Sequence, residues 1–240
     1  MRTPAFLLLF LLAFAAPAGA YNQDRVATGP DGQPVRIQGS VVVVEPDIEL
    51  MLVTSGGLQE PRREWSDTAR RLFPEAVGRV LARGRTERLP DFEIRDDLAP
   101  TSRLGQVVRL NEAVASSIAI YTRQGSHLAT KGRRLDWTLG PGVAELREAT
   151  GADYALFTYI RDSYASGGRT AMRVLGFIVG AAMGSVMDIG GGQQVGVATL
   201  VDLRTGQVVW FNLMSNQSGD LRDAEGAAKT AEQMLTGLPL

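Results

Sequence analysis

The chain has 240 residues, with 25 basic and 26 acidic side chains and a formal net charge of −1. This length fits one large domain or two small ones, and it is enough to bury a substantial core. The nearly balanced charge argues against a general nucleic-acid binder, which carries a basic face. The sequence contains no cysteine, so no disulfide supports the fold and packing must stabilise it.

The first twenty residues have the pattern of a secretory signal peptide. Arg2 gives a positive start, residues 6–16 form an apolar run, and Ala18-Gly19-Ala20 is a small-residue cleavage site. We therefore expect cleavage near Ala20 and a periplasmic or secreted mature protein. The alternative is that the apolar run remains as a membrane anchor, although it is short for a span of ~20 residues.

Residues 21–39 are polar and contain the turn-forming run Gly29-Pro30-Asp31-Gly32. This composition predicts a flexible spacer ahead of a single α/β domain over residues 40–238. The domain should begin with a strand over residues 40–53. Its run Val41–Val44 is typical of a strand that is buried on both faces, and at Pro46 it should end or become an edge because proline cannot donate to a sheet.

Three acidic residues alternate near the end of that strand. Glu45, Asp47 and Glu49 are two residues apart, so in an extended segment they could converge on one side. One hypothesis is a site for a cation or a basic partner. The alternative is a solvated strand end, because three acids without any other type of ligand are weak evidence for a site.

Four helices are expected. The first, residues 60–83, has one apolar stripe and an opposite face rich in arginine, with Pro74 expected to kink or divide it. The arginine face is read either as a surface for anionic lipid or acidic protein, or as a solvated face. The other helices are expected over residues 104–121, 141–150 and 221–235.

The strongest sheet pattern follows the third helix. Strands are expected over residues 153–163, 193–203 and 207–213, the last two joined by a tight turn at Thr205-Gly206. Small residues occupy one face of the middle strand, which favours close packing of a helix. The final helix has an alanine-rich face suited to that side of the sheet.

An apolar, glycine-rich insertion separates the first two of these strands. It covers residues 164–192, and within it residues 174–187 are almost wholly apolar, with a glycine at every fourth position. On a helix such glycines allow another helix to approach to backbone contact. The candidate interaction residues are Gly176, Gly180, Gly184, Val174, Phe177 and Ile178. The hypothesis is membrane entry or self-association through 174–187, and the alternative is a helix packed on its own domain.

These patterns predict an α/β (α+β) fold with a mixed sheet of about five strands, amphipathic helices packed on it and a helical insertion. The junction Gly151-Ala152-Asp153-Tyr154 and the hairpin over residues 197–210 carry a resemblance to a group of bacterial envelope domains. The group includes the curli-secretion lipoprotein, lipoprotein activators of penicillin-binding proteins and the amino-terminal domain of the Tol-system β-propeller protein. The resemblance implies a non-enzymatic periplasmic protein that docks onto other proteins or assembles into rings.

Three functions are consistent with the sequence. The first is a non-catalytic interaction or assembly module of the envelope, whose partners are envelope proteins or further copies of itself. The second is a membrane-inserted homo-oligomer that uses residues 174–187. The third is an exported hydrolase, which is disfavoured because His127 is the only histidine and no serine motif accompanies it. No catalytic, metal or cofactor residues are predicted, and no nucleic-acid partner is expected.

Overall fold

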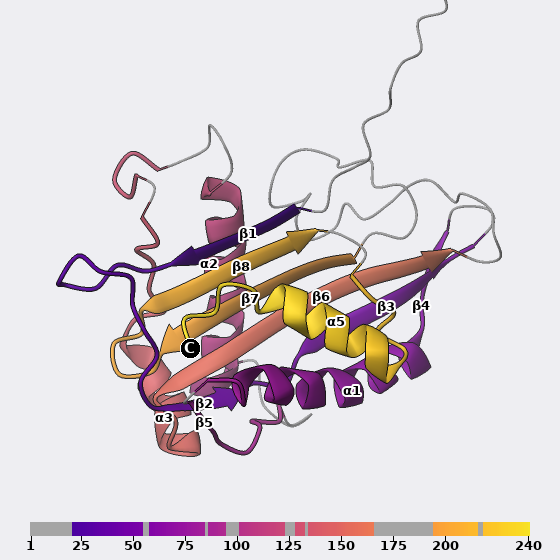
Figure 1. Ribbon diagram of the computed structural model, residues 1–240, viewed down its shortest axis with the longest axis horizontal. Coiled ribbons are helices and arrows are strands. Elements are labelled where there is room, and N and C mark those ends of the chain that lie inside the picture. Colours follow the sequence, from indigo (N-terminus) through magenta and orange to yellow (C-terminus); the bar gives the residue numbers. More distant parts are fainter. Residues whose placement is uncertain are drawn as a thin grey trace, which may run out of the picture.

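The computed structural model describes residues 21–54, 58–84, 86–94, 101–122, 128–132, 134–165, 194–215 and 218–240. In these ranges one mixed sheet of eight strands lies between two layers of helices (Figure 1). The α/β class is confirmed, and the sheet has more strands than the sequence suggested. Within the same ranges, no helix combines the length and the apolar character needed to cross a membrane.

The centre of the sheet is an antiparallel set of three strands. The strand β6 pairs with β7 from Tyr154, opposite Asp202, to Asp162, opposite Gln194. This pairing confirms that the strands on the two sides of the insertion lie in one sheet, and β7 in turn pairs with β8. The eight strands are β1 (Tyr21–Val26), β2 (Ser40–Val43), β3 (Asp47–Val53), β4 (Gln59–Pro61), β5 (Glu87–Arg88), β6 (Tyr154–Ala165), β7 (Gln194–Asp202) and β8 (Val208–Ser215).

The prediction of a flexible spacer over residues 21–39 is wrong for much of that segment. β1 pairs with β8 along its whole length, from Tyr21 opposite Ser215 to Val26 opposite Trp210. Ile37 is also buried, at 7% exposed. The polar composition reflects an edge strand and the turn that follows it, and pairing with a strand almost 190 residues away leaves no local signal.

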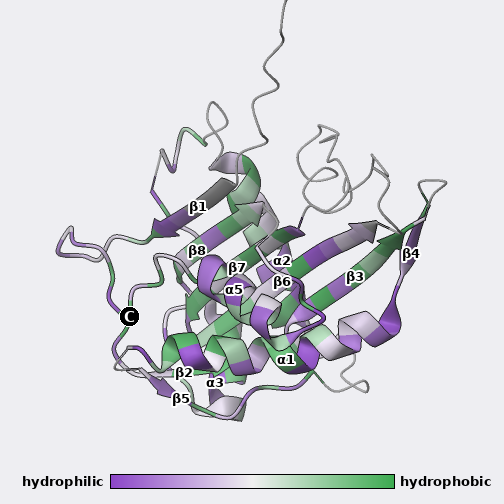
Figure 2. Ribbon diagram, turned by 45° about the vertical axis from the view of Figure 1, so that its right-hand side comes forward, coloured by the Kyte–Doolittle hydropathy of each residue, from purple (hydrophilic) through white to green (hydrophobic). Residues whose placement is uncertain are grey.

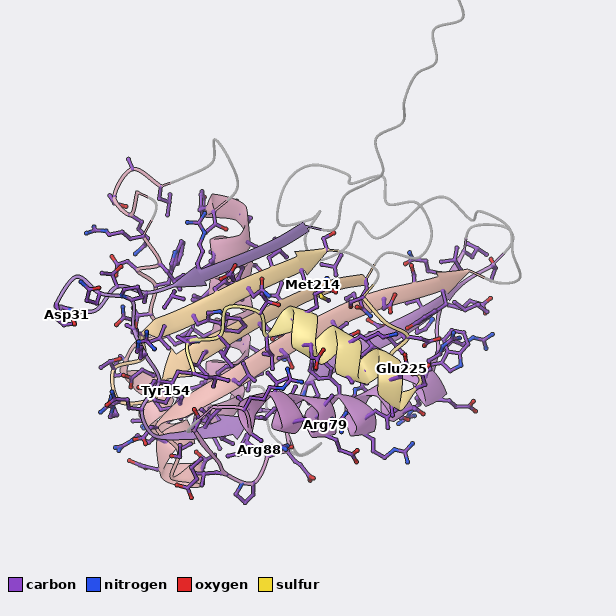
Figure 3. All side chains as sticks on the ribbon, in the orientation of Figure 1. Asp31, Arg79, Arg88, Tyr154, Met214 and Glu225 are labelled. Carbon is purple, nitrogen blue, oxygen red and sulfur yellow. The ribbon has the colours of Figure 1, made fainter. Side chains whose placement is uncertain are left out.

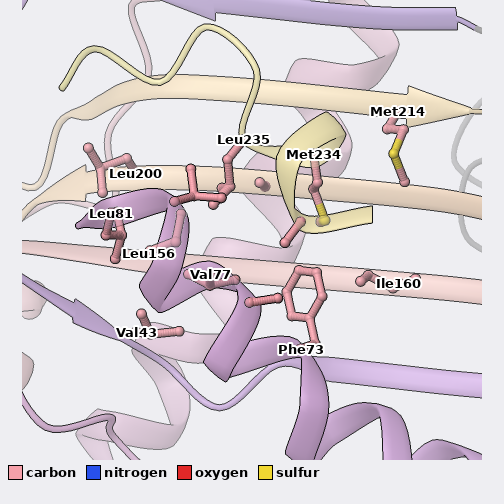
Figure 4. Close-up of a cluster of buried hydrophobic side chains, with 14 of the residues drawn as sticks. Val43, Phe73, Val77, Leu81, Leu156, Ile160, Leu200, Met214, Met234 and Leu235 are labelled. Atoms are coloured by element: carbon pink, nitrogen blue, oxygen red, sulfur yellow. The ribbon is translucent and has the colours of Figure 1, made fainter. Parts of the chain in front are cut away.

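Helices cover both faces of the sheet (Figure 1). α1 (Arg63–Leu81) and α5 (Ala224–Met234) lie on one face, where they enclose a core that includes Phe73, Leu156 and Leu200 (Figure 4). The opposite face packs against α2 (Arg103–Tyr121), the short 3-10 helix η1 (Pro141–Val143) and α3 (Ala144–Thr150). Apolar residues concentrate where the helices meet the sheet (Figure 2).

α1 departs from the sequence expectation at its start and in its middle. Pro61 is not the first helical residue but ends β4, which pairs with β3. Pro74 lies inside one continuous helix rather than dividing it. Much of the arginine face is used within the chain: Arg70 pairs with Asp67 at 3.1 Å, whereas Arg79 is exposed to solvent (Figure 3).

The close packing expected of the last helix is confirmed. Ala227 and Ala231 of α5 are fully buried in the same core cluster as Ala198 of β7. At Gly196 an added Cβ would lie 3.1 Å from the Cε atom of Met214 and 3.3 Å from that of Met234. Small residues on both surfaces therefore set the distance between α5 and the sheet.

The β7–β8 turn provides a test of this architecture. Gly206 has a φ of 77°, and a Cβ there would lie 2.3 Å from the carbonyl oxygen of Gly140. We expect Gly206→Ala to lower the free energy of unfolding by about 2–4 kcal/mol, because it combines backbone strain with a clash. Gly132→Ala is the control, since Gly132 also has positive φ but has nothing within 4 Å. It should cost only about 1 kcal/mol in urea unfolding, and equal losses would contradict the close contact.

Candidate functional site

A β-bulge lies where β2 gives way to β3. Both strands run parallel to β6, with Val43 opposite Leu156 and Asp47 opposite Tyr159. Three residues, 44–46, therefore stand opposite only two residues of β6. Pro46 falls in this interruption, as the sequence predicted. The extra residue separates the strand from the regular ladder and opens the sheet locally.

A cleft of about 270 Å³ opens beside the bulge. It lies between the bulge, α2 and β6, and Ile94 contributes to its wall. Its floor includes Phe157, which is 2% exposed, and the partly exposed Tyr159. We call it the bulge cleft. The charged residues that line it are Glu45, Asp47, Arg109 and Glu112.

The structure places the three predicted acids in different contacts. An oxygen of Glu45 accepts a hydrogen bond from the Ile94 amide at 2.8 Å. Asp47 and Glu49 instead face Arg161 of β6, whose guanidinium lies 2.8 Å from an oxygen of Asp47 and 3.4 Å from one of Glu49. The basic partner of these two acids therefore comes from the chain itself, while Glu45 and Asp47 remain part of the wall of the bulge cleft.

Arg161 supports the backbone as well as the two carboxylates. Its Nη1 atom donates to the carbonyl oxygens of Asp47 and Ile160, each at 3.0 Å. Its side chain is 17% exposed. The residue thus bridges β3 and β6 immediately after the bulge. An arginine directly after the mostly apolar residues 154–160 of β6 was a signal for this contact in the sequence.

The charged residues in the wall of the bulge cleft favour the binding of a positively charged group. Burial raises the pKa of Glu112, and the neighbouring Asp47 carboxylate raises it further, while Arg109 and Arg161 act in the opposite direction. Acidic residues in the wall outnumber basic ones by three to one. Among the described residues no group of three or more histidine, cysteine, aspartate or glutamate side chains could hold a metal ion.

Residues 166–192 of the glycine-rich insertion lie outside the described ranges. This applies to all the candidate interaction residues of that segment, which are Val174, Gly176, Phe177, Ile178, Gly180 and Gly184. Membrane entry or self-association through residues 174–187 therefore stays a prediction. His127, the only histidine, also lies outside the described residues.

Comparison with known proteins finds similarity only among solved structures. No family model matches the chain, and no curated protein matches it. A dodecameric PelC variant from Paraburkholderia phytofirmans is 13% identical with a TM-score of 0.41, over 92% of this chain and 98% of that one. A second PelC dodecamer structure from the same organism, with the same coverage, is 12% identical with a TM-score of 0.36.

Another solved structure is the lipoprotein GNA1162 from Neisseria meningitidis. It is 13% identical with a TM-score of 0.29, over 73% of this chain and 81% of that one. Two of these three similar structures are thus dodecamers and the third is a lipoprotein. At such identities and TM-scores, the likeness does not extend to function.

The ion cluster of Arg161 can be tested by stability. We expect Arg161→Met to lower the free energy of unfolding by about 1.5–3 kcal/mol, because it leaves two carboxylates and two carbonyl oxygens without this donor. Arg83→Met is the matched control: it breaks an exposed pair with Glu232, and such pairs contribute at most about 1 kcal/mol. Chemical unfolding of both variants measures the difference. Equal effects would show that Arg161 does not hold β3 to β6.

Proposed function

We propose that the chain is a non-catalytic exported envelope protein that docks onto another protein through the bulge cleft. The signal-peptide pattern supports export. β1 begins at Tyr21, directly after the expected cleavage site, so processing after Ala20 would leave the eight-stranded sheet complete. The mature chain would then enter the periplasm or the exterior with its fold intact.

The observation that carries the proposal is the charge and shape of the bulge cleft. Glu45, Asp47 and Glu112 face a space of about 270 Å³, with Arg109 as the one basic residue among those lining it. Burial raises the pKa of Glu112, and the neighbouring Asp47 carboxylate raises it further, while Arg109 and Arg161 act to lower it. Its aromatic floor suits the apolar stem of a long side chain. An arginine or lysine of a partner protein has both the positive charge that matches the acidic wall and the apolar stem that matches the floor.

The contacts of the acids favour binding over chemistry. Glu45 is held by a backbone amide and Asp47 by a guanidinium. A general acid or base needs a carboxyl group with access to the reacting atoms, whereas these two groups are fixed by other partners. Fixed carboxylates are well suited to orient an incoming basic side chain, because little conformational freedom is lost on binding.

Site-specific photo-crosslinking in cells tests the proposal. A photo-reactive residue at position 112 should yield discrete adducts with another envelope protein, identified by mass spectrometry. The control carries the same residue at position 75, which is also exposed but lies on α1, on the opposite face of the sheet. We expect position 75 to give no such adduct.

A charge change tests the chemistry of that contact. Adducts from position 112 should fall at least tenfold when Asp47→Lys is introduced, because a cation in the cleft repels a basic side chain. Glu75→Lys makes the same change in charge on α1 and should leave the adducts unchanged. Adducts that persist with Asp47→Lys, or that arise equally from position 75, would contradict docking through the bulge cleft.

A further inference from the structure

A second polar cluster, which shares no residue with the lining of the bulge cleft, lies where β6 and β7 meet the residues before α5. Three of its members are almost wholly buried: Asp162 is 3% exposed, Gln194 is 1% and Thr230 is 0%. Buried polar groups of this kind are stable only when hydrogen bonds satisfy them. We call this cluster the Asp162 network; its members are Asp162, Tyr164, Gln194, Ser218 and Thr230.

Gln194 connects the sheet to the segment before α5. Its amide nitrogen donates to Asp162 at 2.8 Å and to the carbonyl oxygen of Gly219 at 3.1 Å. Its amide oxygen accepts from the hydroxyl of Ser218 and, at 3.2 Å, from that of Thr230 in α5. One side chain therefore joins β6, α5 and residues 218–219.

A second set of contacts holds the same segment from outside. The Leu221 amide donates to the hydroxyl of Tyr164 at 3.1 Å. The guanidinium of Arg222 lies 4.0 Å from the centre of the Tyr164 ring and 4.7 Å from that of Trp65 in α1. Asp220 fixes this guanidinium through a contact of 2.6 Å. Residues 218–223 are thus clamped against β6, α1 and α5.

Residues 218–223 are packed too closely against α5 to shift by a small distance. A Cβ on Gly219 would lie 2.4 Å from the carbonyl oxygen of Gly226 in the first turn of α5. The amide of Gly226 in turn donates a hydrogen bond of 2.7 Å to the side chain of Asp223, which caps that helix. A tightly packed segment of this kind has two arrangements, docked or released, rather than a continuous range.

We propose that residues 218–223 form a proton-controlled latch, which is docked more firmly when Asp162 is protonated and is released more readily when Asp162 is ionised. The latch closes over the ends of β6 and β7. It is independent of the bulge cleft and of the proposed docking function.

The groups around Asp162 explain why it acts as the switch. Burial raises its pKa to about 6, although hydrogen bonds from Tyr164 and Gln194 act to lower it, and the charge of Asp220 raises it further. Arg222, on the same segment as Asp220, is the cation that interacts electrostatically with Asp162. β7 and α5 contribute the neutral Gln194 and Thr230, and α1 contributes Trp65 with Arg62 above its ring.

The direction of the pH effect follows from linkage. A released Asp162 in water returns toward its ordinary value of 3.8, so the docked form holds its proton up to about pH 6 while the released form has lost it. The two values differ by about two pKa units, each of which is a factor of ten. The equilibrium constant for release should therefore rise by about 100-fold in total from below pH 4 to about pH 7, most of it before pH 6, and then stay constant.

Hydrogen exchange of the full mature protein measures this constant. The probe is a peptide that contains Leu221 and Arg222, with its exchange rate divided by the intrinsic rate at each pH. We expect protection to fall through a step that ends by about pH 7. In Asp162→Asn the step should be absent, because the amide cannot ionise. Asp67→Asn, at an exposed carboxylate of α1, is the matched control and should keep the step.

A second measurement follows Asp162 itself in the wild-type protein. The carboxyl carbon of Asp162 in the wild-type protein should titrate by NMR with a midpoint near 6. The fluorescence of Trp65, obtained as the difference between wild type and Trp65→Phe, should change over the same range. A carboxyl midpoint near 4, or protection of Leu221 that is independent of pH between 4 and 7, would overturn the latch.

Discussion

The fold depends on one extra residue in the strand pair that β2 and β3 make with β6. Val41 and Val43 of β2 lie in the core cluster beneath α1 and α5, and so do Ile48 and Leu50 of β3. The first two have odd numbers and the last two have even numbers, although side chains of a regular strand alternate strictly. The bulge shifts the alternation by one, so the apolar residues of both strands reach the same core.

The same irregularity produces the candidate site. A regular strand would fill the edge of β6, whereas residues 44–46 leave its ladder and make room beside α2. Arg161 then restores the connection between β3 and β6 through two carbonyl oxygens and two carboxylates. What remains is an open space whose charge is mostly negative. Fold and site thus have a common physical origin.

Local patterns predicted the parts of the fold that depend on local chemistry. The turn at Gly206 and the small-residue contact between α5 and β7 both follow from propensity and periodicity. β1 was missed because its stability comes from β8, which is distant in sequence. Pro61 was misplaced because a helix start and an edge strand both tolerate proline.

The site was only partly predictable for a related reason. Glu45 and Asp47 were recognised by their alternate spacing, but their contacts come from Ile94 and from Arg161, which is 114 residues away from Asp47. Nothing near those acids in the sequence indicates such partners. Asp162 could not be identified at all, because its raised pKa arises from burial among residues of β7 and the segment before α5.

Deletion of one residue tests the central role of the bulge most directly. Removal of Glu45 leaves two residues opposite two and keeps the apolar side chains of both strands on their faces, so we expect a folded protein that is less stable by about 1–2 kcal/mol. Removal of Leu50 interrupts the regular ladder and should unfold the chain. Urea unfolding followed by circular dichroism compares them. Two unfolded variants, or two that are equally stable, would contradict the account.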